Sequence, residues 1–140
     1  MSEQTTETTR FPQTWEELEK QPLFTDLPDL TKPYELNVAQ SALFEVTRTR
    51  INERLQQISR LLDGKKPDET KTLTLVAELV QYSDLFYREL AKDKQAWERW
   101  TQGRTLDGLS EIFITLTRYY AEQLGKSNNS KTNATSAGSN

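Results

Sequence analysis

Apolar residues recur every three or four positions in three long segments of this chain, and this spacing constrains the fold most. A three-to-four spacing returns to one face of an α-helix, whereas strand residues alternate every two positions. The pattern predicts helices over residues 38–62, from Pro67 to about residue 92, and over 106–124. In the first segment the stripe is Phe44, Ile51, Leu55, Ile58 and Leu62, widened near its start by Ala39, Ala42, Leu43 and Val46.

The middle segment is apolar on two faces, which predicts a central helix covered from both sides. The alternating stretch Thr72–Leu75 is locally typical of a strand, but the helical period continues on both sides of it. One face carries Leu73, Val76, Val80, Tyr87 and Leu90, and the other carries Leu75, Leu79, Tyr82 and Phe86.

Capping residues mark where helices should begin and end. Thr14, followed three residues later by Glu17, predicts the start of a short helix at Trp15. Asn37 is the expected N-cap of the helix over 38–62. A second short helix is predicted over about 94–102, and Gly125 is expected to end the last helix after residue 124.

The two ends of the chain differ in composition from its middle. Residues 1–10 contain one hydrophobic residue and residues 127–140 contain two, so both are predicted to be disordered. Residues 11–37, interrupted by Pro22, Pro28 and Pro33, are expected to form an arm that packs on its own domain or on a neighbouring subunit. The fold class predicted for residues 38–126 is all-α, a small bundle of three main helices plus short helices.

The chain has 0 Cys and 0 His, which excludes disulfides, thiol nucleophiles and Cys/His zinc sites. The usual acid–base residue near neutral pH is also absent. No residue pattern identifies an enzyme, so we expect no catalytic residues, no metal ligands and no cofactor. Asp84 lies on the segment that is apolar on two faces, and its carboxylate is a candidate for a buried polar network or for a ligand.

Charge is unevenly distributed although the net charge is only −3. Residues 16–35 carry six acidic and two basic side chains, whereas residues 45–66 carry six basic and three acidic ones. Attraction between the acidic arm and the basic helix, within one chain or between copies, is the plainer interpretation, and binding of nucleic-acid phosphates is the alternative. The candidate residues for self-association or nucleic-acid contact are Arg48, Arg50, Arg54 and Arg60.

Aromatic residues gather in the last third of the helical region, and most are expected in the core. Tyr119 and Tyr120 point about 100° apart on a helix, so we expect some aromatic side chains to remain at the surface. Surface Tyr and Trp residues are typical anchors of protein interfaces. The candidate partner-binding residues are Phe86, Tyr87, Trp97, Trp100, Tyr119 and Tyr120.

No apolar stretch approaches the 18 residues that suggest a membrane-spanning helix, and no secretory signal is recognisable at residues 1–10. We therefore expect a cytoplasmic protein with no membrane partner.

Three segments of the chain resemble the tail assembly chaperones of long-tailed bacteriophages. They are Tyr82–Tyr87, Trp97–Trp100 and Leu106–Ile112, and they are similar to the second half of such proteins from phages of Gram-positive bacteria. The resemblance covers roughly residues 38–126 and includes the polar C-terminal tail. The Pro-interrupted arm departs from the compact start of many family members.

The resemblance implies a non-catalytic protein that binds the tape measure protein, keeps its hydrophobic helices soluble and recruits tail protein subunits. It also implies a longer product made by ribosomal frameshifting near the end of the short gene. Separately, the charge distribution leads us to expect homo-oligomers that form through the N-terminal arm. For a phage-encoded chain, the location would be the host cytoplasm. The alternative is a helical regulatory adaptor that binds nucleic acid or a transcription factor through the basic face of the helix over 38–62.

Overall fold

The computed structural model describes the backbone of residues 10–139 and the side chains of residues 10–126. This part of the chain contains no strand, and one isolated bridge joins Leu30 to Ala91. The all-α prediction is therefore confirmed. The elements are α2 (Trp15–Glu19), η1 (Pro22–Phe24), η2 (Pro33–Glu35), α3 (Val38–Leu62), α4 (Glu69–Leu90), α5 (Lys94–Thr101) and α6 (Leu106–Ser139).

The predicted starts of α2 and α3 are confirmed by their caps. The Glu17 amide donates to Thr14 Oγ1 over 3.1 Å. The Gln40 amide donates to Asn37 Oδ1 over 2.8 Å, and the Gln40 side chain accepts from the Asn37 amide over 2.9 Å. Each cap satisfies an amide that has no partner inside the helix.

Helix α4 begins slightly later than predicted, at Glu69 rather than directly after Pro67. The reason is Asp68, whose carboxylate accepts from the Lys71 amide over 3.0 Å and so acts as the N-cap. The strand-like stretch Thr72–Leu75 lies inside this helix.

Helix α6 does not end where the sequence predicts. It continues through Gly125 to Ser139, so the expected end at residue 124 is wrong. Glycine costs about 1 kcal/mol in a helix relative to alanine, which weakens a helix without stopping it. The disorder predicted for residues 127–140 stays a prediction, since the side chains there lie outside the described part. The disorder predicted for residues 1–10 falls almost entirely on residues 1–9, which lie outside it too.

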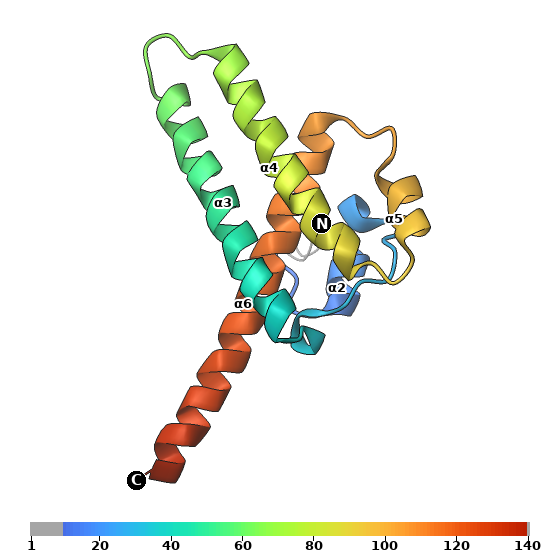
Figure 1. The fold of residues 1–140 in the computed structure, drawn as a ribbon, viewed down its shortest axis with the longest axis vertical. Coiled ribbons are helices and arrows are strands. Elements are labelled where there is room, and N and C mark those ends of the chain that lie inside the picture. Colours follow the sequence, from blue (N-terminus) through green and yellow to red (C-terminus); the bar gives the residue numbers. More distant parts are fainter. Residues whose placement is uncertain (1–9, 140) are drawn as a thin grey trace, which may run out of the picture.

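Helices α3 and α4 form an antiparallel hairpin, and α6 crosses one side of it (Figure 1). Helix α4 contacts both α3 and α6. The loop end of the hairpin stands clear of the rest of the chain, and residues 62–71 are all exposed.

The arm over residues 11–37 packs on its own domain. Leu18, Phe24 and Leu30 are fully buried in the core. The Thr31 amide donates to the Leu90 carbonyl over 2.8 Å, and the Tyr120 hydroxyl donates to the Thr31 carbonyl over 2.6 Å. The arm thus joins the end of α4 to the middle of α6, and within the described residues it is part of the folding unit.

We expect Leu30→Ala to destabilise the protein by about 2–5 kcal/mol, because truncating a buried leucine removes apolar contact and leaves a cavity. Urea unfolding followed by circular dichroism measures this change. Tyr34→Ala is the matched control in the same arm, since Tyr34 is 77% exposed, and it should change the free energy of unfolding little. An arm that unfolds independently of the core would give equal, small effects for both variants.

Candidate functional site

Most of the predicted partner-binding aromatics belong to the core and are closed to a partner. Tyr87, Trp97 and Tyr120 are fully buried, and Phe86 and Tyr119 are nearly so. Trp100 is half-buried, and its indole N–H donates to the Thr25 carbonyl over 2.8 Å. The expectation that Tyr119 or Tyr120 remains at the surface is therefore wrong, whereas Trp100 keeps part of its side chain exposed.

The arm explains why both tyrosines are buried although they point in different directions. Trp15 of α2 packs edge-on against both rings, with centroids 6.0 Å from Tyr119 and 6.2 Å from Tyr120. The hairpin covers one face of α6, and α2 covers the neighbouring face. Neither tyrosine is therefore available to anchor a partner in this structure.

Tyr87 is the centre of the contact between α4 and α6. Its ring stacks on Phe113 with centroids 5.9 Å apart and an angle of 11° between the planes. Its hydroxyl is hydrogen-bonded to Thr117 Oγ1 over 2.9 Å. Burial raises the pKa of Tyr87 and Tyr120 well above the ordinary value for tyrosine.

Asp84 has a structural partner. Its Oδ1 accepts a 2.9 Å hydrogen bond from the indole N–H of the buried Trp97, so it links α4 to α5. In the described part of the chain, no group of three acidic side chains is placed to hold a metal ion.

The four candidate arginines lie on two sides of α3. Arg48 pairs with Glu45 over 3.3 Å and lines a small hollow against α6. Arg50 and Arg54 lie on the other side, where each guanidinium carbon is 4.8 Å from the centroid of the Tyr82 ring of α4. Arg60 lies further along α3, near its end.

The predicted attraction between the acidic arm and the basic helix is not seen within the chain. No ion pair among the described residues joins the arm to α3. Arg54 instead contacts Glu53 of its own helix at 3.6 Å and Glu78 of α4 at 3.8 Å. Arg48 and Arg54 thus find their acidic neighbours within the hairpin, while the arm is held by apolar burial and backbone hydrogen bonds.

The side of the hairpin opposite α6 is uncovered, and we call this side the seam. Near the base of the hairpin it contains a groove of about 200 Å³, the proximal groove. Two leucines at its edges, Leu43 of α3 and Leu85 of α4, are 58% and 64% exposed. The proximal groove is lined by Gln40, Leu43, Thr47, Arg50, Tyr82, Leu85, Phe86, Glu89 and Leu90.

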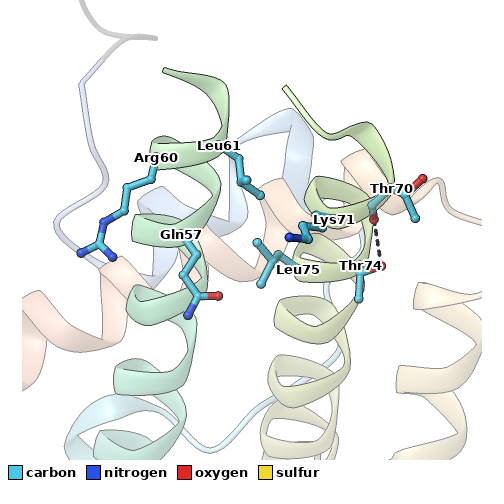
Figure 2. A pocket seen from close by; sticks show the side chains of 7 residues that line it. All are labelled: Gln57, Arg60, Leu61, Thr70, Lys71, Thr74 and Leu75. Atoms are coloured by element: carbon cyan, nitrogen blue, oxygen red, sulfur yellow. Dashed lines mark hydrogen bonds between the residues drawn. The ribbon is translucent and has the colours of Figure 1, made fainter. Parts of the chain in front are cut away.

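A second groove, the distal groove, lies at the loop end of the hairpin and has a volume of about 470 Å³. Figure 2 shows Leu61, Lys71 and Leu75 pointing into the space between the two helices, while the guanidinium of Arg60 points away from it. The distal groove is lined by Gln57, Arg60, Leu61, Thr70, Lys71, Thr74 and Leu75.

The two grooves lie on the same side of the hairpin. Leu43 and Leu61 are 18 residues apart on α3, which is five turns, so they point in the same direction about 27 Å apart. On α4, Leu75 and Tyr82 are separated by two turns and face the same side in the same way. The seam is therefore one elongated surface with apolar side chains at both ends, and Arg54 with the neighbouring carboxylate of Glu78 lies between them.

Sequence reasoning placed Leu43 and Val46 in the buried stripe and did not single out the seam. Both side chains are exposed, because the stripe buried against α4 and α6 is narrower and centres on Phe44 and Ile51. The signal for the seam was the second apolar face of the middle helix. That face was assigned to the core, whereas it is only partly covered.

Comparison of the chain with known protein families, with curated proteins and with solved structures finds no match. Within the described residues, no helix is long and apolar enough to span a membrane.

The buried tyrosines predict a loss of stability at alkaline pH. The unfolded chain ionises its tyrosines near pH 10, whereas burial raises the pKa of Tyr87, Tyr119 and Tyr120 in the folded chain. The folded state then holds more protons than the unfolded state, so the free energy of unfolding falls as pH rises above about 10.

Each strongly shifted tyrosine contributes about 1.4 kcal/mol per pH unit to this fall. Urea unfolding between about pH 8 and 11.5 measures it, and absorbance at 295 nm reports ionisation. Tyr120→Phe should make the fall shallower, whereas Tyr34→Phe at an exposed position should leave it as in the parent chain. If all tyrosines of the folded protein ionised near pH 10, as tyrosines of an unfolded chain do, that result would contradict the burial of these side chains.

Proposed function

We propose that this protein is a non-catalytic, helix-binding chaperone of the phage tail assembly type, and that the seam binds an amphipathic helix of the tape measure protein. The family part of the proposal rests on the sequence resemblance. The helix-binding part rests on one observation, the uncovered and partly apolar side of the α3–α4 hairpin.

The exposed leucines of the seam carry the proposal. Leu43 and Leu85 flank the proximal groove at exposures of 58% and 64%, and Leu61 and Leu75 point into the distal groove. Two adjacent helices leave a furrow into which the side chains of a third helix fit at an axis distance of about 8–10 Å. An extended furrow with apolar ends suits a helix better than a small molecule.

The proposed architecture places the ligand helix beside a bundle of three main helices, α3, α4 and α6. Helix α6 covers one side of the hairpin, and the ligand helix would cover the opposite one. A surface whose middle is polar gives weaker binding than a continuous apolar interface, which suits a chaperone that must release its partner when the tail assembles. The expected location of this activity is the host cytoplasm.

The gene's surroundings test the family part of the proposal. We expect a neighbouring gene that encodes a very long helical protein, and an overlapping reading frame near codon 125. Sequencing the locus checks both features. If neither is present, the tail assembly assignment is wrong, whatever the seam binds.

We expect Leu85→Glu to weaken binding of an amphipathic helical fragment of that neighbouring protein by about tenfold or more, because a charge at an apolar anchor costs at least about 1.4 kcal/mol. Fluorescence anisotropy with the labelled fragment measures the dissociation constant.

The matched control is Leu73→Glu. Leu73 lies on the same helix and is 59% exposed, but it lines neither groove. Both variants should unfold at the urea concentration of the parent chain. Equal binding by the two variants would show that the seam is not the helix-binding surface.

A further inference from the structure

We infer that the seam selects its helix by charge as well as by shape: the ligand is an amphipathic helix with two acidic side chains about 11 residues apart, one over Arg50 and one over Lys71. The inference rests on the proposed function and deepens it, because it names the chemistry of the helix that binds there.

The cations of the seam differ in their surroundings: Arg54 lies near carboxylates, Arg60 points away from its groove, and Arg50 and Lys71 face the grooves. Arg54 lies close to both Glu53 and Glu78. Arg50 and Lys71, in contrast, form no ion pair within the described part of the chain. Arg50 lies against the Tyr82 ring, and a guanidinium in that position still offers N–H groups at its edge to a carboxylate.

Lys71 gives the distal groove its charge preference. The residues that line this groove include two cations, Arg60 and Lys71, and no acidic residue. Lys71 points into the space between Leu61 and Leu75, whereas the Arg60 guanidinium points away (Figure 2). An apolar helix laid over Lys71 would cover its ammonium group without a counter-charge, which costs free energy. A ligand that brings a carboxylate to this point avoids that cost.

The proximal groove is different, because its charges balance. It contains Arg50 and Glu89, and the Glu89 carboxylate lies 3.9 Å from the Lys94 ammonium. A second carboxylate of the ligand therefore belongs over Arg50 rather than nearer the base of the hairpin.

The geometry of α4 sets the spacing of the two acidic residues. The Tyr82 ring marks the level of Arg50, and Lys71 precedes Tyr82 by 11 residues. Eleven residues make three turns and about 16 Å. A ligand helix that lies along the seam returns to the same face after the same 11 residues, so its carboxylates at positions i and i+11 would meet both cations.

Three labelled 18-residue helical peptides with one shared apolar face test the inference. They carry Glu, Gln or Lys at positions i and i+11, and their binding to the full chain is measured by fluorescence anisotropy. Two exposed ion pairs should make the Glu peptide bind about 2- to 30-fold more tightly than the Gln peptide at low salt. The Lys peptide should bind most weakly, and the differences should shrink at about 500 mM salt.

Charge reversal on the protein provides the decisive comparison. Lys71→Glu should weaken binding of the Glu peptide and strengthen binding of a peptide with Lys at the position facing residue 71. The substitution lies in the first turn of α4, where the helix dipole favours an acidic side chain, so the fold is retained. Arg99→Glu makes the same charge change at an exposed position on α5 and should alter no peptide's affinity.

Each remaining outcome contradicts the inference. If the three peptides bind equally at low salt while Leu85→Glu still weakens them, charge selection is wrong and the helix-binding proposal stands. If no peptide binds, both are wrong. If a 20-base-pair DNA duplex binds instead and Lys71→Glu weakens it, the seam is a phosphate-binding surface.

Discussion

The packing of Tyr87 against α6 determines which surfaces of this protein remain open. Its ring lies between Phe86, Phe113 and Tyr120, and its hydroxyl is hydrogen-bonded to Thr117. A buried hydroxyl without a partner costs about 1–3 kcal/mol, so this pair fixes how α4 meets α6. With one side of the hairpin committed to α6, the opposite side is left without cover. The seam is thus a consequence of the core rather than a separate feature.

The arm covers the aromatic surface of α6 that the hairpin leaves open. It buries Leu18, Phe24 and Leu30 and brings Trp15 against α6. A small chain buries a limited fraction of its surface, and recruiting an N-terminal segment into the core increases that fraction. The apolar side chains that remain exposed lie mainly on the hairpin. This distribution separates the part of the chain that provides stability from the part that is free to bind.

The sequence predicts local features of this fold better than contacts between distant segments. The starts of α2 and α3 follow from caps within four residues, and the helical period identifies the helices. The burial of Tyr119 depends on Trp15, more than 100 residues away, and periodicity contains no information about that contact. Likewise, the two apolar faces of α4 indicate that a neighbouring helix could cover each face. They do not indicate that α3 would cover one of them incompletely.

The loop end of the hairpin is expected to adapt most easily to a ligand. Residues 62–71 are all exposed, so local opening there breaks few apolar contacts. The base of the hairpin is different, because Phe44 packs against Phe86 and Tyr120 and joins it to the core. A helix bound along the seam would therefore meet a rigid surface around Leu43 and Leu85 and a more yielding one around Leu61 and Leu75. At the base of the hairpin the ligand helix would have to match a surface that is already formed. At the loop end, the surface around Lys71 would adjust to the ligand on binding.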